Sequence, residues 1–263
     1  MFIHNINPVI LQIGQLQIRY YGLFMALSVL FGIFFISREY KRLNPEVNEE
    51  ELYNALFIMV LFGLLGARLD HILLHNPQFY INNPIEIIAI WHGGLAAHGA
   101  FLGGFLGLWL YSKKRKLKFW QIADLAVIPL SLGLALGRIA NFINGELYGR
   151  ITSVPWAVKF AEAEGFRHPS QLYESITDFA TFIILNLIFK LKIRRKDGSI
   201  FWSFMLIYSA FRFFVEFFRE PDYVIFGLTL GQFTSIIIII ISIPMLFKLS
   251  KTKNEIKSRR RKK

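Results

Sequence analysis

Residues 137–150 (GRIANFINGELYGR) have the side-chain types that bind an anionic headgroup. Arg138, Asn141 and Asn144 recur every third residue, so on a helix they form one polar stripe. A guanidinium group beside amide donors suits a phosphate or an ester. Glu146 and Arg150 are four residues apart, and on a helix we expect them to pair. The alternative is a solvated helix end, but three glycines bracket this dense polar run and favour a site.

Arg212 and Glu216 are four residues apart in the aromatic run 211–222 (FRFFVEFFREPD). In an apolar environment an ion pair at this spacing compensates both charges. One reading is a structural bridge that holds the helix. The other is an arginine that faces an anionic lipid and is oriented by the glutamate.

His98 and Tyr21 are the remaining candidates. His98 belongs to the glycine-rich run 91–104 (WHGGLAAHGAFLGG), and a histidine inside a membrane span is either functional or hydrogen-bonded between helices. Histidine side chains titrate near neutral pH, which suits a general base. Tyr21 lies in RYYGL, residues 19–23, where an interfacial belt of aromatic residues is the ordinary explanation.

Other common catalytic templates are missing from the sequence. There is no cysteine, so the chain has no disulfide, no thiolate metal site and no thiol of its own. There is no GxSxG elbow, P-loop or HExxH motif. His92 and His98 are six residues apart, which does not place them on one helix face as a metal pair. We therefore expect no metal and no cofactor.

The elements that must position these residues are apolar helices. Of the 263 residues, 54% are hydrophobic and 18% are charged, and the mean hydropathy is +0.43. An ordinary soluble domain has roughly 25% charged residues. The sequence predicts an all-α polytopic membrane protein with about seven transmembrane helices. The expected spans are residues 20–37, 52–73, 89–112, 119–140, 172–189, 199–217 and 230–247.

Positive charge predicts the orientation of these spans. The net charge is +12, and 22 of the 30 Lys and Arg residues lie in four segments, 38–42, 113–118, 190–196 and 248–263. These segments follow alternate expected spans, so all four lie on one side, which the positive-inside rule makes cytoplasmic. The N-terminus is then outside and the C-terminus inside. The other eight basic residues, seven of them Arg, lie toward the outer side, and we expect Arg19 and Arg68 to snorkel there.

This orientation divides the chain into five parts. We expect the basic tail to be disordered and to touch anionic lipid, with nucleic acid a much weaker alternative. Residues 9–20 partly alternate polar and apolar residues, which predicts an outer strand or an interfacial arm. The parts are an extracytoplasmic arm 1–19, helices one to four over 20–140, a small extracytoplasmic head 141–171, helices five to seven over 172–247, and a cytoplasmic tail 248–263.

Six motifs together resemble the prolipoprotein diacylglyceryl transferases of bacteria. They occur in order from residue 19 to residue 222, so the resemblance covers most of the chain, and the run 137–150 is the most specific. One local departure is Asp70-His71, where family members often carry less polar residues such as Gly-Tyr. The role of that corner stays open. The motifs are RYYGL, GAR at 66–68, HGGLAAHGAFLGG, GRIANFINGELYGR, RHPSQLYE and FRFFVEFFREPD.

The resemblance implies a reaction at the outer leaflet of the bacterial cytoplasmic membrane. The family moves the diacylglyceryl group of phosphatidylglycerol onto the lipobox cysteine of a prolipoprotein signal peptide. A thioether forms and glycerol-1-phosphate leaves. The implied partners are thus phosphatidylglycerol, the prolipoprotein and the lipid bilayer. The implied site residues are Tyr21, His98, Arg138, Asn141, Gly149, Arg212 and Glu216.

Roles follow from the charges that develop in such a displacement. A thiolate is a better nucleophile than a thiol, and the departing phosphate ester needs stabilisation. We assign Arg138 and Arg212 to the phosphate, with Asn141, Asn144, Glu146 and Gly149 around the headgroup. His98 is the candidate base. Tyr21, Glu216 and an activated arginine compete for that role.

Two other classes of function remain open from the sequence. A transporter or flippase of an anionic lipid explains intramembrane arginines, but it predicts repeats in two halves, and the sequence has none. A non-catalytic lipid-binding scaffold does not require the combination of histidine, tyrosine, arginine and asparagine.

Overall fold

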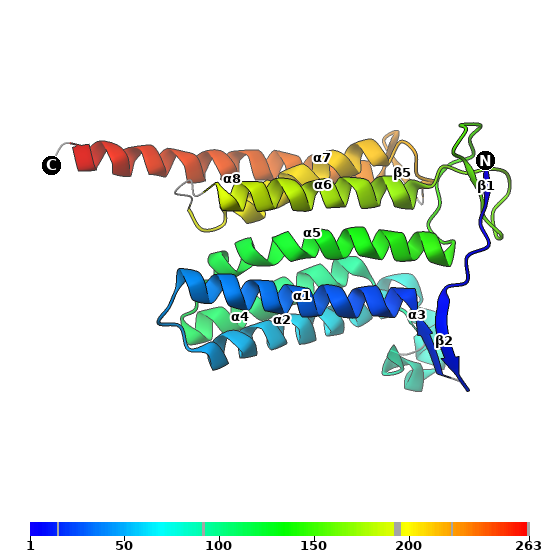
Figure 1. Ribbon diagram of the computed structural model, residues 1–263, viewed down its shortest axis with the longest axis horizontal. Helices are drawn as coiled ribbons and strands as arrows, with labels where there is room; N and C mark the ends of the chain where they lie inside the picture. The colour runs from blue at the N-terminus through cyan, green and yellow to red at the C-terminus, as the bar shows by residue number, and fades with distance from the viewer. Residues whose placement is uncertain (15, 91–92, 192–195, 222, 262–263) are drawn as a thin grey trace. The chain divides into compact units, whose positions relative to one another are not determined.

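The computed structural model describes residues 1–14, 16–90, 93–191, 196–221 and 223–261, with the side chains of residues 16, 75 and 251–261 left out of the description. The fold is mostly helical (Figure 1). The chain forms two compact units. One consists of residues 1–32 with 124–263, and the other of residues 33–123.

The unit of residues 33–123 is built around a pair of helices, α2 (Glu49–Asp70) and α4 (Ala97–Arg115). Asn48 begins α2, because its side chain accepts a hydrogen bond from the Glu50 amide at 3.0 Å. Between the two helices lie three short elements, the π-helix η1 (His71–His75), α3 (Pro77–Asn82) and the 3-10 helix η2 (Pro84–Ile87).

Glycines allow α2 and α4 to approach closely. A methyl group at Gly66 would lie 2.3 Å from the carbonyl oxygen of Gly99, and one at Gly103 would lie 2.2 Å from that of Phe62. Such distances leave no room for any side chain. Small residues at a helix contact let the two backbones pack directly, which is how helices associate in membranes. The glycine run 91–104 therefore has a structural use in this pair.

The other unit contains α5 (Phe119–Asn144), α6 (Ser170–Lys190), α7 (Ser199–Val215) and α8 (Leu230–Arg261), with α1 (Tyr20–Leu43) and α5 each crossing a unit boundary. Helices α6, α7 and α8 pack side by side (Figure 1). Buried Asp124 starts α7 by accepting the amides of Gly198 at 2.8 Å and Phe201 at 2.7 Å. A carboxylate in this place satisfies donors that the first turn of a helix leaves unpaired.

The described residues also form three two-stranded sheets, all outside the long helices. The predicted strand in residues 9–20 is confirmed, and it is an antiparallel hairpin of β2 (Val9–Ile13) and β3 (Leu16–Arg19). The N-terminal β1 (Phe2–Ile3) runs parallel to β4 (Val158–Lys159). Strands β5 (Val224–Ile225) and β6 (Leu228–Thr229) form a hairpin between α7 and α8.

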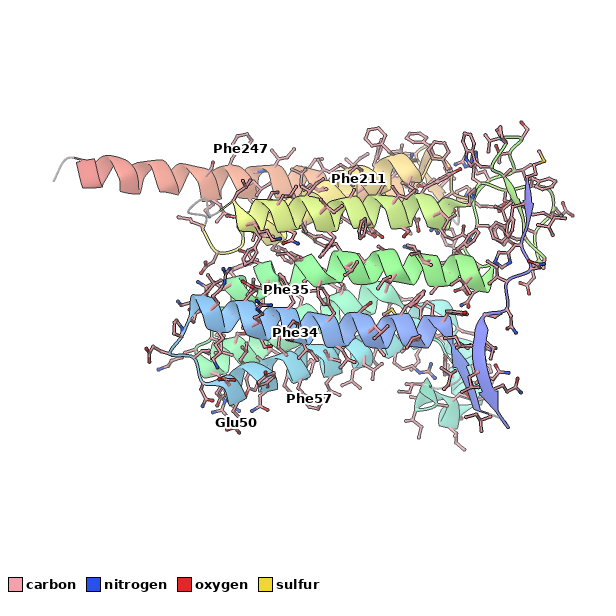
Figure 2. The ribbon with its side chains drawn as sticks, viewed as in Figure 1. Phe34, Phe35, Glu50, Phe57, Phe211 and Phe247 are labelled. Atoms are coloured by element: carbon pink, nitrogen blue, oxygen red, sulfur yellow. The ribbon has the colours of Figure 1, made fainter. Side chains whose placement is uncertain are left out.

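Five helical segments within the described residues are long and apolar enough to cross a membrane. They expose large apolar side chains, and Phe34, Phe57 and Phe247 are about three-fifths exposed (Figure 2). Helix α7 is apolar but shorter, and α4 carries glycines and a basic end. The prediction of a multi-pass helical protein is confirmed, with five of the seven expected spans. The five are Tyr20–Leu43, Glu49–Leu74, Phe119–Asn144, Ser170–Lys190 and Leu230–Ser250.

Two sequence-based expectations about helix boundaries are wrong. The span expected over 89–112 does not begin as a helix, because Gly93 and Gly94 have φ of +90° and +76°, and α4 starts only at Ala97. The tail from Lys248, expected as disordered, continues α8 to Arg261. Extending an existing helix avoids the cost of nucleation, and Lys, Arg and Glu are good helix formers.

The expectation that Arg68 snorkels is also wrong. Arg68 is buried near the end of α2, and its guanidinium donates to backbone carbonyls between residues 86 and 94. Among these are Ile87 at 3.0 Å and Gly94 at 3.0 Å. Arg68 thus donates hydrogen bonds to the irregular segment that leads into α4. These bonds satisfy carbonyl groups that would be bonded within the backbone if the segment were a regular helix.

Because Gly66 has no space for a side chain, we expect Gly66→Ala to lower the free energy of unfolding of the protein by about 1–3 kcal/mol. Gly22→Ala is the matched control. Gly22 is also helical, and a methyl group there would meet nothing within 4 Å. Thermal unfolding of both purified variants in detergent checks this. Equal melting temperatures for the two would contradict the close packing of α2 and α4.

Candidate functional site

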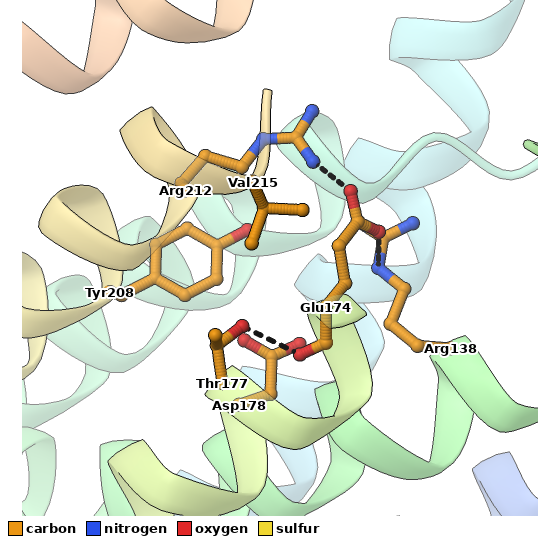
Figure 3. Close-up of a pocket in the computed structure, with 7 residues that line it drawn as sticks. All are labelled: Arg138, Glu174, Thr177, Asp178, Tyr208, Arg212 and Val215. Atoms are coloured by element: carbon orange, nitrogen blue, oxygen red, sulfur yellow. Dashed lines mark hydrogen bonds and ion pairs between the residues drawn. The ribbon is translucent and has the colours of Figure 1, made fainter. Parts of the chain in front are cut away.

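Glu174, in the first turns of α6, is the centre of a buried cluster of charges. Its carboxylate is 4% exposed and forms ion pairs with three arginines. Arg138 on α5 approaches with Nε 2.7 Å from Oε2, and Arg219 with Nη1 2.8 Å from Oε1. Arg212 on α7 is the third partner (Figure 3). One carboxylate therefore joins α5, α6 and the end of α7.

Glu216 is the second carboxylate of the cluster and lies directly after α7. It pairs with Arg212, which confirms the predicted ion pair, and with Arg219 Nε at 3.6 Å. Its Oε2 accepts a hydrogen bond from the hydroxyl of Thr229 at 3.0 Å. A methyl group at Gly231 would lie 2.2 Å from Oε1, so α8 also leaves space for this carboxylate.

A small pocket opens onto this cluster (Figure 3). Arg138 and Arg212 are each about one-fifth exposed, while the carboxylates of Glu174 and Glu216 are almost fully covered. Three guanidinium groups share two paired carboxylates, so Arg138 and Arg212 keep N–H groups at the pocket that suit an anion. Asp178 adds a carboxyl group to the lining. The lining residues are Arg138, Glu174, Thr177, Asp178, Tyr208, Arg212 and Val215.

The predicted stripe of Asn141 and Asn144 is present at the end of α5. Both amides donate to Oε1 of Glu146, at 2.7 Å and 3.1 Å. The expected pairing of Glu146 with Arg150 is wrong. Helix α5 ends at Asn144, and Gly145 has a φ of +74°, so helical spacing no longer applies beyond it.

Tyr21 lies near this stripe at the start of α1. Its hydroxyl is within electrostatic range of Glu146 and Arg138. The first half of α1 packs on α5, since a methyl group at Gly133 would meet Ser28 Cβ at 3.1 Å. The structure therefore groups Tyr21 with the asparagine stripe and with one arginine of the cluster.

Gly149 and Arg150 fasten the segment that carries Arg219. The Gly149 amide donates to the carbonyl oxygen of His168, and the Arg150 amide to that of Phe218, both at 2.9 Å. Arg150 Nε donates to the carbonyl oxygen of Arg219 at 2.7 Å. Burial lowers the pKa of the His168 side chain, which favours its neutral form. Gly149 has a positioning task here, since its backbone leaves no space for a side chain.

His98 belongs to the unit of residues 33–123, in the first turn of α4. Its side chain is exposed and makes no hydrogen bond or ion pair within the part of the chain that the structure describes. His92 lies outside the described residues. The same part holds no group of three His, Asp or Glu residues arranged to bind a metal.

Sequence reasoning missed the central residue of the cluster. Glu174 lies in RHPSQLYE, a segment that alone does not separate a helix start with interfacial anchors from a functional site, and Arg219 is one of the eight outer basic residues. A usable signal existed, because an acidic residue inside a membrane span is costly unless a cation pairs with it. Three arginines are expected near one membrane face, and Glu216 alone cannot pair with all of them, so a second acidic partner was needed. Asp178, inside the expected span 172–189, carried the same signal, whereas Tyr208, which also lines the pocket, carried none.

The fold and the cluster define a multi-pass helical membrane protein with a buried cationic site. The family model described as prolipoprotein diacylglyceryl transferase matches residues 8–248, and the chain belongs to this family. The expected resemblance is therefore confirmed over nearly the whole chain.

Three relatives carry the name phosphatidylglycerol–prolipoprotein diacylglyceryl transferase. The protein from Ehrlichia ruminantium (strain Gardel) is 40% identical over 96% of this chain and 100% of its own length. That from Geobacter sulfurreducens is 38% identical over 88% of each chain. That from Rickettsia rickettsii (strain Sheila Smith) is 38% identical over 92% of this chain and 93% of its own.

Removing the shared carboxylate is expected to disrupt the cluster. Glu174→Gln leaves three arginines with only Glu216 as an ion-pair partner within the cluster, so we expect a loss of about 3–5 kcal/mol of stability. Glu162→Gln, at an exposed loop position, is the control. Denaturant unfolding in detergent measures both variants. A Glu174→Gln protein as stable as the control would refute the central role of this carboxylate.

Within residues 137–150, we expect glycine-to-alanine changes to differ sharply. A methyl group at Gly149 would lie 2.3 Å from the carbonyl oxygen of Phe218, whereas one at Gly137 meets only Met25 Sδ at 4.0 Å. Gly149→Ala should displace the segment that carries Arg219 and lower the enzymatic rate by at least tenfold. The rate of Gly137→Ala should stay within about threefold of the unchanged protein. Rates at matched amounts of folded protein check this, and similar losses in both would contradict it.

Proposed function

We propose that this protein transfers the diacylglyceryl group of phosphatidylglycerol to the lipobox cysteine thiol of a prolipoprotein. A carbon–sulfur bond forms at the glyceryl carbon while its bond to the phosphate oxygen breaks. The thiol proton is removed, and glycerol-1-phosphate leaves. Family membership and the names of the relatives support this reaction. The observation that carries it is the pair of arginines, Arg138 and Arg212, on one buried pocket.

Arg138 and Arg212 would bind the phosphate through the guanidinium N–H groups that Glu174 does not occupy. Glu174 fixes the orientation of Arg138, and Glu174 and Glu216 fix that of Arg212, so little reorganisation is needed when charge develops on the leaving phosphate. Glu174 and Arg219 position this pair. Asp178 and Tyr208 complete the pocket, and two carboxyl groups beside the arginines would keep them from holding the product phosphate too tightly.

We assign the lipid headgroup to the segment after α5, with Asn141, Asn144, Glu146 and Gly149, and propose Tyr21 as a neighbour of this segment. His98 would accept the thiol proton, since its imidazole is exposed and uncommitted to any described residue. Glu216 is a weaker candidate for the base, because its carboxylate already serves two arginines and Thr229.

The proposed topology has seven transmembrane helices in the cytoplasmic membrane, with α4 and α7 added to the five long spans. The N-terminus is outside and the C-terminus is cytoplasmic, because the basic segments follow alternate spans. The arm 1–19 and the head 141–171 then face the outer leaflet, with spans over 20–140 and 172–247. The tail 248–263 is cytoplasmic. Protease accessibility of tagged termini in intact spheroplasts tests this orientation.

The transfer itself can be measured with phosphatidylglycerol labelled in its acyl chains and a peptide that contains a lipobox. We expect Arg138→Ala and Arg212→Ala to lower the rate by about 10²–10³, the loss typical of removing a charge-stabilising donor. Arg19→Ala is the matched control, because Arg19 is exposed in β3 and binds only Gln17 among the described residues.

The outcomes separate the alternatives. Label on the peptide cysteine identifies the transferase, whereas a flippase would move the lipid between leaflets with no labelled cysteine, and a scaffold would only bind it. Full activity in Arg138→Ala would overturn the phosphate assignment. Substantial activity in His98→Gln would remove the role of base from His98.

A further inference from the structure

Helix α4 begins without a capping side chain of its own. Its N-cap residue is Ala96, which offers no side-chain acceptor to the free amides of the first turn. Helix starts normally use Ser, Thr, Asp or Asn at this position, because their side-chain oxygen accepts a hydrogen bond from an amide of the first turn. His98 is the second residue of this helix. The position of His98 therefore depends on how the first turn of α4 is otherwise held.

The last turn of α2 supplies the missing acceptors. The amide of Ala96 donates to the carbonyl oxygen of Ala67 at 3.0 Å. The amide of Gly99 donates to Oδ2 of Asp70 at 2.7 Å. These two hydrogen bonds flank His98, one on each side along the chain. Both partners lie in the unit of residues 33–123.

The Asp70 side chain is held against the α4 backbone by packing as well. A methyl group at Gly99 would lie 2.4 Å from Asp70 Cβ and 2.2 Å from the carbonyl oxygen of Gly66. The absence of a side chain at Gly99 is thus what lets the carboxylate reach the amide. A negative charge at the N-terminal end of a helix is also favoured by the helix dipole.

We propose that Asp70 is the positioning residue for His98. Its carboxylate caps α4 from the neighbouring helix and fixes the backbone on which the imidazole is carried, while the imidazole itself stays free for substrate. This inference rests on the proposed role of His98 in the transfer. It assigns a task to the corner at Asp70-His71, which the sequence left open.

The kinetic test compares two replacements of Asp70 in the full-length protein. Asp70→Ala removes the acceptor, so we expect kcat to fall by about tenfold or more, since small displacements of a catalytic group cost this much. The KM for phosphatidylglycerol should change less than about twofold, because the arginine cluster is untouched. Asp70→Asn keeps an oxygen acceptor of the same length and should retain kcat within about threefold. Glu46→Ala, at an exposed loop carboxylate, is the control.

A second measurement reads the position of residue 98 without any transfer reaction. The chain has no cysteine, so His98→Cys provides a single site for a nitroxide spin label. We expect Asp70→Ala to increase the mobility of this label, and Asp70→Asn to leave it unchanged. Where Asp70→Ala yields too little folded protein, Asp70→Glu replaces it. Glutamate keeps the charge but moves the carboxylate by one methylene, and it should mobilise the label too.

The results separate this inference from the proposed function. An active wild-type enzyme whose Asp70→Ala variant keeps its kcat, or whose label at residue 98 does not become more mobile, overturns the positioning role. Equal kcat losses in Asp70→Asn and Asp70→Ala also overturn it. No transfer by the wild-type protein, combined with the expected label mobilities, would reject the proposed function and keep the structural role of Asp70.

Discussion

The site depends on one buried carboxylate that three arginines share. Without Glu174, the guanidinium groups of Arg138, Arg212 and Arg219 would repel one another in an environment that screens charge poorly. With it, they converge from α5, α7 and the segment after α7 on one pocket. Among the described residues, Glu216 is the only other acid that pairs with these arginines, so three guanidinium groups share two carboxylates and keep N–H groups for a ligand. Guanidinium N–H groups at a pocket inside a helical membrane protein suit an anionic lipid headgroup.

The sequence predicted the helical fold class and the ion pair of Arg212 with Glu216, for reasons that are local. Apolar runs of span length and the spacing of Arg212 and Glu216 need no knowledge of tertiary structure. The failures arise where distant segments decide. The Glu146 carboxylate accepts hydrogen bonds from two asparagines and does not pair with Arg150, because α5 ends at Asn144. The span expected from residue 89 gives way to an irregular segment, because Arg68 on another helix supplies its hydrogen bonds. Neither partner can be read from spacing along the chain.

Arginine serves two opposite purposes in this protein. Arg68 gives its donors to backbone carbonyls and lies buried, so it stabilises an irregular segment and has little left to offer a ligand. Arg138 and Arg212 give part of their donors to Glu174 and remain partly exposed at the pocket. The difference follows from the partner. The carbonyl groups around Arg68 take up most of its N–H donors. A carboxylate that pairs with a guanidinium occupies one or two donors, sets the orientation of the group and leaves its other N–H groups available.

The arginines and the histidine are held by different means, and this suits different chemistry. A group that must stabilise charge on a departing phosphate benefits from a side chain locked in place, which Glu174 provides through direct ion pairs. A group that must receive a proton and release it again needs ring nitrogens free of permanent partners. In the role proposed for it, His98 would meet this need, because the constraint acts on its backbone neighbours, Ala96 and Gly99, and leaves the imidazole without a partner in the described chain. The glycines of α4 make that constraint possible, since any side chain at Gly99 would push Asp70 away from the amide it accepts.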